Sequence, residues 1–343
     1  MFSFVNDYSE GACKQVLDNL VKTNYLQTDG YGLDQFCKHA EEIIRNLIDN
    51  QNADVHFIPG GTPANVLAIS LLKSYEAVIC ADNGHINTHE TGAVEATGHK
   101  ILEVKGVDGK ITAKQIEDVV LDHTDEHVTL PKMVFISNPS EYGTIYSKQE
   151  LTDISNMCKK YGLYLYLDGA RLGAGLMSKE NDLTLKDIAA LVDIFYIGGT
   201  KNGALLGEAM VIINDDLKPN FRFLIKQHGS MLAKGRIIGI EFITLLENGL
   251  YFELADNADK MAQQLNDLFK EHNIQMFIES STNQIFPILE NSLIAKLKEK
   301  YQLGTWCKYD DDHTVIRFVC SWATKQENID AFKQDFETII KGE

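Results

Sequence analysis

The chain has 343 residues, of which 44% are hydrophobic, 24% charged and 9% aromatic, and this composition argues against a disordered or fibrous protein. The length predicts about two domains. The 49 acidic residues exceed the 32 Lys and Arg to give a net charge of −17. We therefore expect no binding to nucleic acid, whose phosphates need clustered cations, and none to an anionic membrane surface.

The sequence shows no pattern typical of export or membrane insertion. No apolar run approaches the roughly 20 residues that span a bilayer, and the first residues lack the basic and apolar regions of a secretory signal. None of the cysteines forms a C-x-x-C pair, so neither a metal site nor a disulfide framework is indicated. We expect reduced thiols and a cytoplasmic location.

Helical and strand patterns alternate between about residues 35 and 215. The pattern predicts helices at 36–50, 62–75 and 151–162, and strands at 53–58, 76–82, 132–138, 163–168, 191–199 and 208–215. Thr62 is expected to cap the second helix, with Pro63 at its first position, and Gly162 to end the third. This alternation predicts an α/β domain with a largely parallel sheet.

After about residue 250 the pattern changes. It predicts a long amphipathic helix at 251–273, strands at 274–279, 283–289 and 313–322, a short helix at 291–300 and a last helix at 326–342. We therefore expect a large domain over residues 1–248 and a small α+β domain over 249–343. The stretch 225–250 is expected to form a helix that joins them.

Two strand ends in the large domain are suited to binding an anion and a ring, because ligands of open α/β sheets bind at the carboxyl ends of strands. Gly60, Gly61 and Thr62 lead into a helix, whose free N–H groups suit a phosphate. An ordinary turn with a threonine cap is the alternative. His85 follows the strand 76–82 and is either a ligand-stacking imidazole or a surface histidine.

Two further strand ends carry ionisable groups. Asp168 ends a buried strand and needs a partner, for which Arg171 is the simplest candidate. Lys201 lies between glycines after another buried strand, where desolvation lowers the pKa of an amine and suits it to Schiff-base chemistry. The glycine-flanked motif around Lys201 does not match the P-loop pattern. No G-x-G-x-x-G motif opens the first strand–helix unit, so the sequence does not favour a nicotinamide-binding site.

Together these four strand ends match what the cofactor pyridoxal 5′-phosphate (PLP) requires. Its phosphate needs an anchor, its ring nitrogen needs a carboxylate that keeps it protonated, and its aldehyde needs a lysine. The sequence therefore predicts a PLP-dependent enzyme.

From Asn6 to about Arg317 the chain resembles the L-threonine aldolase branch of the β-eliminating lyases, which are fold-type-I PLP-dependent enzymes. The most specific matches are Asp168-Gly169-Ala170-Arg171 and the glycine-flanked Lys201. Supporting matches are Tyr31-Gly32-x-Asp34, Gly60-Gly61-Thr62-x-x-Asn65, His85-Ile86, Glu90-x-Gly92-Ala93 and Ile316-Arg317. The resemblance implies a mainly parallel seven-stranded sheet in an aspartate aminotransferase-like large domain, with a small C-terminal α+β domain.

The resemblance also implies roles for the residues at the strand ends. Lys201 would bind the cofactor aldehyde, Asp168 would pair with the ring nitrogen, and His85 would stack on the ring. The cofactor phosphate would be held by Gly60, Gly61 and Thr62.

The same resemblance implies how the substrate binds. Arg171, which also counts among the cofactor-binding residues, and Arg317 would grip the substrate carboxylate, a task suited to the guanidinium fork. Asn6 falls where the family has a serine that assists them. Family members are homodimers or homotetramers with sites at the subunit interface, where Lys234 would contact the neighbour's phosphate.

The chain departs from the family pattern at three places, of which the N-terminal one and the one at 138–142 concern the substrate. Val5-Asn6-Asp7-Tyr8 replaces Arg-Ser-Asp-Thr, and Thr200 replaces a serine before the lysine. Asn138-Pro139-Ser140-Glu141-Tyr142 stands where the family often has Thr-His-Asn, which removes a histidine proposed to act on the β-hydroxyl.

The predicted reaction is retro-aldol cleavage of a β-hydroxy-α-amino acid, of the L-threonine or L-allo-threonine type, to glycine and an aldehyde. Candidate bases for the β-hydroxyl proton are His85, His89, a water and Lys201. The alternative enzyme is a PLP-dependent β-eliminating lyase acting on an aromatic or other β-substituted amino acid. The alternative outside enzymes is a silent α/β protein that binds a phosphorylated ligand.

Overall fold

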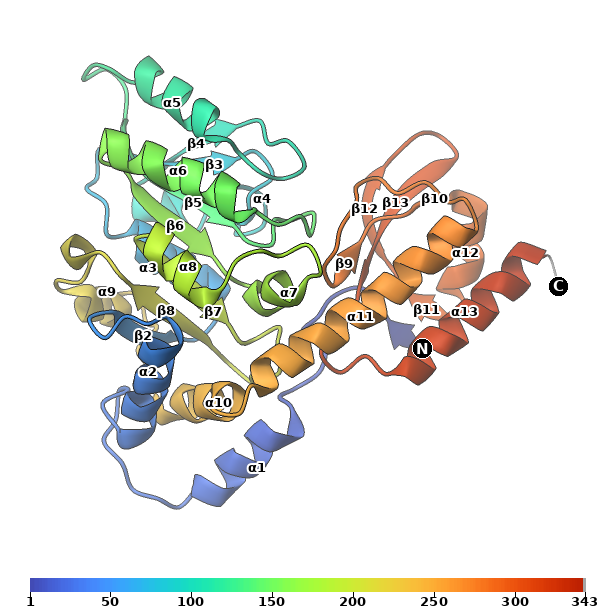
Figure 1. The fold of residues 1–343 in the computed structure, drawn as a ribbon, viewed down its shortest axis with the longest axis horizontal. Coiled ribbons are helices and arrows are strands. Elements are labelled where there is room, and N and C mark those ends of the chain that lie inside the picture. Colours follow the sequence, from blue (N-terminus) through green and yellow to red (C-terminus); the bar gives the residue numbers. More distant parts are fainter. Residues whose placement is uncertain (342–343) are drawn as a thin grey trace.

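The protein consists of two lobes of different size, as the computed structural model describes them for residues 1–341. Figure 1 shows a large lobe around a central sheet and a small lobe that contains both the first residues and the last helix. The long helix α11 (Leu250–Glu271) runs from one lobe into the other.

The large lobe is built on a seven-stranded sheet with the order β2-β8-β7-β6-β5-β3-β4. Its strands are β2 (Asp54–Ile58), β3 (Glu76–Ala81), β4 (Lys100–Val104), β5 (Leu130–Ser137), β6 (Tyr164–Asp168), β7 (Ile194–Gly198) and β8 (Glu208–Ile212). The pairs from β4 to β7 are parallel, and β8 runs antiparallel to both β7 and β2. The predicted mainly parallel seven-stranded sheet of a fold-type-I enzyme is thereby confirmed.

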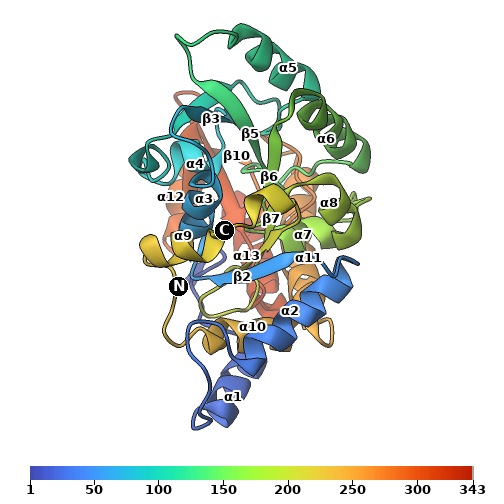
Figure 2. The ribbon, with the colours of Figure 1, turned by 90° about the vertical axis from the view of Figure 1, so that its left-hand side faces the viewer.

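Helices cover both faces of the sheet, as Figure 2 shows. They are α1 (Lys14–Thr23), α2 (Gln35–Leu47), α3 (Gly61–Ile69), α4 (His85–Thr88), α5 (Ala113–Asp122), α6 (Lys148–Tyr161), α7 (Leu172–Met177), α8 (Leu185–Leu191), α9 (Phe221–Gln227) and α10 (Arg236–Leu246). α3, α4 and α9 share a core with one set of strand side chains, and α2, α5, α6, α8 and α10 share a core with the alternate set. A strand buried on both faces is apolar at nearly every position away from its ends, which explains the continuous apolar runs in the sequence.

The small lobe combines a short antiparallel sheet with helices. Its elements after α11 are β9 (Gln284–Ile285), β10 (Ile288–Glu290), α12 (Asn291–Lys298), β11 (Tyr301–Gln302), β12 (Gly304–Lys308), β13 (His313–Val319) and α13 (Gln326–Lys341). The first strand of the chain, β1 (Phe2–Ser3), pairs in parallel with β11. Phe4 is fully buried in the core of this lobe. The division at residue 248 stays a prediction.

Helix α3 begins earlier than the sequence pattern predicts. Gly60, not Thr62, is the residue before the helix, and Gly61 is its first residue. The reason is backbone geometry, since Gly60 has φ 106° and ψ 161°, a conformation that residues with a side chain rarely adopt. Thr62 therefore lies within the first turn of the helix.

Other boundaries also differ from expectation. Residues 274–279 form no strand beyond a single bridge between Met276 and Pro287. The stretch 225–250 contains the end of α9, a break and α10, so the helix that joins the lobes is α11. Gly162 ends α6 with φ 65°, as predicted, and the predicted last residue of the final helix, 342, lies outside the described residues.

Candidate active site

A cavity of about 230 Å³ lies at the carboxyl ends of the parallel strands. Its walls come from strand ends, from the start of α3 and from the N-terminal segment. The lining residues are Tyr8, Gly61, Thr62, Asn65, His85, Ser137, Pro139, Glu141, Asp168, Ala170, Arg171, Tyr196, Thr200, Lys201 and Glu208. Most of the predicted site residues are therefore brought together, although they come from distant parts of the chain.

Lys201 is the amine of the cavity. It follows β7 by three residues and lines the cavity wall. Burial, reinforced by the positive charge of Arg171, lowers the pKa of Lys201 below its ordinary value. A larger fraction of neutral amine results, which is the form that attacks a carbonyl.

Asp168 is held by neutral donors and not by a cation. Its side chain accepts hydrogen bonds from Tyr196 Oη at 2.5 Å, from Asn65 Nδ2 at 3.1 Å and from the Ala170 N–H at 2.9 Å. The residue is only 3% exposed. The alternative of an ion pair with Arg171 is wrong, because Arg171 pairs with another residue. Asp168 thus presents a buried carboxylate suited to pairing with a protonated ring nitrogen.

His85 is fixed by a buried carboxylate that sequence reasoning did not place in the site. Its Nδ1 lies 2.8 Å from Glu90 Oε1, which also accepts from Asn65 Nδ2 at 2.7 Å. Burial opposes a charged imidazole, but the Glu90 bond and the nearby acids Glu141 and Asp168 outweigh it and raise the pKa of His85. The Glu90 carboxylate therefore orients the His85 ring and stabilises its charged form relative to an isolated imidazole.

The start of α3 has the geometry of an anion cradle. Gly61 and Thr62 line the cavity. A Cβ atom on Gly61 would lie 3.2 Å from Tyr196 Oη, and Gly60 has the positive φ given above. Two glycines are thus needed to turn the helix N-terminus toward the cavity, where its free N–H groups attract an anion.

Arg171 forms a buried ion pair with Asp7. Nε and one terminal nitrogen of Arg171 donate to the two Asp7 oxygens at 2.7 and 3.0 Å, and Asn283 Nδ2 donates to Asp7 at 2.9 Å. Burial alone would raise the pKa of Asp7, but Arg171 and Lys201 outweigh it and lower the pKa. No sequence pattern predicts this pair, since 164 positions separate the partners.

Arg317 lies at the small-lobe side of the site. Its guanidinium donates to the Val5 carbonyl at 3.3 Å and lies 5.3 Å from the centre of the Trp306 ring. Arg317 forms no ion pair with an acid among residues 1–341, and of the acids near it in sequence Asp310 pairs with His313 and Asp311 with Lys308. Burial and the neighbouring Arg171 lower the pKa of Arg317, so the two cations lie close enough to interact.

Asn6 and Lys234, like Gly60 and Arg317 described above, are not among the residues that line the cavity. Asn6 Oδ1 accepts from the Tyr8 N–H and from Ser9 Oγ, both at 3.0 Å, so this side chain shapes the N-terminal segment. Lys234 is exposed on the loop before α10.

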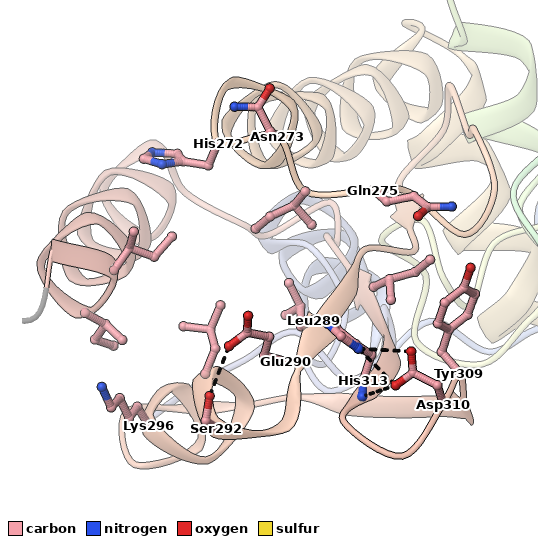
Figure 3. A pocket seen from close by; sticks show the side chains of 15 residues that line it. His272, Asn273, Gln275, Leu289, Glu290, Ser292, Lys296, Tyr309, Asp310 and His313 are labelled. Atoms are coloured by element: carbon pink, nitrogen blue, oxygen red, sulfur yellow. Dashed lines mark hydrogen bonds and ion pairs between the residues drawn. The ribbon is translucent and has the colours of Figure 1, made fainter.

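A larger cavity, of about 760 Å³, lies on the small lobe (Figure 3). None of the predicted site residues lines it. Several of its polar groups bond to one another, as Figure 3 shows for Glu290 with Ser292 and for Asp310 with His313. Size alone therefore does not identify the candidate active site, because the predicted reactive residues line the smaller cavity.

The donor set of the smaller cavity fits PLP group by group. The helix N-terminus suits the phosphate, Asp168 suits the ring nitrogen, and the amine of Lys201 suits the aldehyde. A sheet of this topology with these residues defines the class of fold-type-I PLP-dependent enzymes.

Comparison with known proteins agrees with this class. The model of the family described as β-eliminating lyase matches residues 7–292. The low specificity L-threonine aldolase of Pseudomonas sp. (strain NCIMB 10558) is 32% identical and covers 98% of this chain and 97% of its own. The chain belongs to the β-eliminating lyase family.

Solved structures show the same relationship. A Leishmania major threonine aldolase is 47% identical, covers 99% of this chain and 100% of its own, and superposes with a TM-score of 0.98. A putative L-allo-threonine aldolase of Listeria monocytogenes, with 20% identity and coverage of 98% and 96%, has a TM-score of 0.75 and shares the fold.

Proposed function

We propose a division of roles among the site residues in the reaction that this family membership indicates. The chain is a PLP-dependent lyase of the threonine aldolase type, which cleaves a β-hydroxy-α-amino acid to glycine and an aldehyde. It is therefore an enzyme and not a silent phosphate-binding protein. When bound, PLP supplies an electron sink for the carbanion that bond cleavage leaves at Cα.

The cofactor-binding residues act through charge and position. Lys201 binds the cofactor aldehyde, and its lowered pKa supplies the neutral amine. Asp168 holds a proton at the ring nitrogen, and Asn65 and Tyr196 keep its carboxylate in place. Gly60, Gly61 and Thr62 hold the phosphate at the start of α3, and His85 covers the ring.

Arg171 and Arg317 bind the substrate carboxylate. Arg171 lines the cavity, and the effect of its charge on the pKa of Arg317 supports a shared binding place between the two guanidinium groups. Asp7 orients Arg171, and Asn6 assists by shaping the segment that carries Asp7. Because this segment also contacts Arg317 through the Val5 carbonyl, both lobes contribute to substrate binding.

The observation that carries this proposal is the convergence of Lys201, an Asp168 free of any arginine partner and a glycine-built helix start on one cavity. The test is a product assay on L-threonine, L-allo-threonine and phenylserine with the PLP-loaded protein. We expect glycine and the matching aldehyde in equal amounts. Formation of a 2-oxo acid and ammonia, with no glycine, would instead indicate the β-eliminating alternative.

We also propose a homodimer or homotetramer with active sites at the subunit interface. Support comes from an exposed apolar stripe on and after α1, formed by Leu17, Val21 and Tyr25, of which Tyr25 is 94% exposed. A stripe of this kind on a folded protein indicates a binding surface. Lys234 is proposed to reach the phosphate of the neighbouring subunit.

The six cysteines are free thiols in the structure, which supports a reducing compartment, and we propose the cytoplasm. Among residues 1–341 no helix is both long and apolar enough to cross a bilayer. We propose residues 1–248 as the cofactor-binding domain and 249–343 as the small domain, with the N-terminal strand packed on the latter.

A further inference from the structure

The cleavage step needs a group that accepts the β-hydroxyl proton. Such a group must line the cavity, carry a free lone pair and not already be committed to other hydrogen bonds. The imidazole and carboxyl groups that line the cavity are His85, Glu141, Asp168 and Glu208.

Three of these four groups are poor acceptors. His85 has a raised pKa and is held by Glu90. Asp168 already accepts three hydrogen bonds. Glu208 accepts from the Gly199 N–H at 2.9 Å, and burial raises its pKa to about 7, so a substantial fraction is protonated at neutral pH.

His89 is also a weak candidate. It is absent from the cavity lining, its Nδ1 bonds to Thr88 Oγ1 at 2.5 Å, and its ring stacks on Trp306 with 6.3 Å between centres. Burial lowers the pKa of His89, which makes its ring a weaker proton acceptor.

Glu141 differs from all of these groups. It lies four residues beyond the end of β5, whose last residue, Ser137, is the register partner of Asp168. It lines the cavity, and the one side-chain hydrogen bond it accepts among residues 1–341 is a long one of 3.3 Å from Ser137 Oγ. Its charge acts on Lys201 and Arg171, which places it within electrostatic reach of the groups that hold cofactor and substrate.

We propose that Glu141 accepts the β-hydroxyl proton of the substrate, an inference that rests on the retro-aldol function proposed above. The O–H proton passes to a Glu141 carboxylate oxygen, and the O–H electron pair becomes the second bond of the aldehyde C=O. The Cα–Cβ pair stays with Cα, which then takes up a proton to give glycine. The Glu141 proton then returns to solvent, to which this half-buried side chain is partly exposed.

The test compares Glu141→Gln with Glu141→Asp and with a control, Glu103→Gln, on the exposed face of β4. Glutamine keeps the shape of the side chain but cannot take a proton. We expect kcat for L-threonine cleavage to fall by about 10²- to 10⁴-fold in Glu141→Gln. Glu141→Asp should recover part of this loss, and Glu103→Gln should equal the wild type.

Two measurements separate this role from a merely structural one. Glycine has no β-hydroxyl, so its affinity for Glu141→Gln, and the rate at which its Cα proton exchanges with deuterated water, should stay within about threefold of wild type. PLP content and the midpoint of thermal unfolding should also be unchanged. A parallel loss of exchange and cleavage would overturn the proposal in favour of a structural role.

Retention of wild-type cleavage by Glu141→Gln would overturn the proposed role of Glu141 in favour of another proton acceptor, such as Lys201 or a water. The wild-type arm tests the proposed function by itself. If the wild type releases no glycine from any β-hydroxy amino acid, both the function and the role of Glu141 are wrong. If it does and the variant equals it, only the role of Glu141 is wrong.

Discussion

Single side chains in this site depend on partners that lie far away in the sequence. Asn65 illustrates this, because its amide nitrogen bridges Glu90 and Asp168 while its oxygen accepts from Tyr166 Oη at 2.6 Å. One neutral residue thereby links the Glu90 carboxylate, which holds His85, to the Asp168 carboxylate, which is proposed to hold the ring nitrogen. A buried network of this kind is favourable only when its members are paired.

Replacement of Lys201 by alanine tests the cofactor attachment. Borohydride reduction of the wild type, followed by peptide mapping, should leave the pyridoxyl group on Lys201, because this amine is buried, lines the cavity and has a lowered pKa. Lys201→Ala should retain PLP through its phosphate site but show no reduced adduct. The exposed Lys105→Ala should label as the wild type does. An adduct on any other lysine would disprove the assignment.

Asp7→Asn tests the buried ion pair through its pH dependence. The folded-state pKa of Asp7 is lowered, so the folded chain binds fewer protons there than the unfolded chain, whose Asp pKa is about 3.9. The stabilisation is therefore fully present above about pH 4 and is lost as the pH falls through the folded-state pKa. At pH 7 the variant leaves Arg171 unpaired and should lose about 3 kcal/mol of unfolding free energy.

The measurement is thermal and urea unfolding of both proteins at several pH values. The difference between wild type and Asp7→Asn should be largest near neutral pH and should narrow below pH 4. The exposed Asp122→Asn serves as the control and should differ little from wild type at any pH. A difference that is constant with pH would show that the Asp7 charge does not stabilise the fold.

At the scale of the elements, four parallel strands and one helix start build the site. The ends of β3, β5, β6 and β7 deliver His85, Glu141, Asp168 and Lys201 to one edge of the sheet, because parallel neighbours end on the same side. Helix α3 adds the anion cradle, and its position depends on the backbone of Gly60.

Gly60→Ala tests that cradle. A Cβ at φ 106° forces the backbone into a region nearly closed to alanine, so we expect a loss of about 1–3 kcal/mol in unfolding free energy and weaker retention of PLP during dialysis. Gly11→Ala, where an added Cβ would meet no atom of residues 1–341 within 4 Å, is the matched control and should retain both properties. Equal PLP retention in the two variants would contradict the proposed role of the cradle.

At the scale of the whole molecule, the N-terminal segment joins the two lobes beside the site. Phe4 is packed in the small lobe, the Val5 carbonyl accepts from Arg317, and Asp7 binds both Arg171 and Asn283. Any relative movement of the lobes must therefore move the residues proposed to hold the substrate carboxylate.

Val21→Glu tests the proposed subunit interface. Val21 is 75% exposed on α1, and a charge there should oppose burial against a second copy. Light scattering after gel filtration should give a dimer or tetramer for the wild type and a smaller species for the variant. Gln15→Glu, an exposed position on the same helix outside the stripe, should leave the mass unchanged. A monomeric wild type would contradict the proposal.

The sequence by itself determined the α/β architecture, and it predicted which polar groups gather at one cavity. Continuous apolar strands alternate with amphipathic helices, which requires a sheet covered on both faces, and the polar residues that interrupt this pattern stand at strand ends. Asp168 and Lys201 are two of these strand-end residues. The start of α3 differs from the local prediction, because a cap at Thr62 and a glycine at positive φ at position 60 predict different first residues.

Only the tertiary structure decided how these groups are paired. Asp7 meets Arg171 across 164 positions, Asn65 meets Asp168 across 103, and Asn283 meets Asp7 across 276. Local pattern and propensity act over a few residues, whereas these contacts depend on how the sheet, its helices and the small lobe pack together. For the same reason the sequence suggests Arg171 as the partner of Asp168. In the structure Arg171 pairs with Asp7, and Asp168 accepts hydrogen bonds from neutral donors.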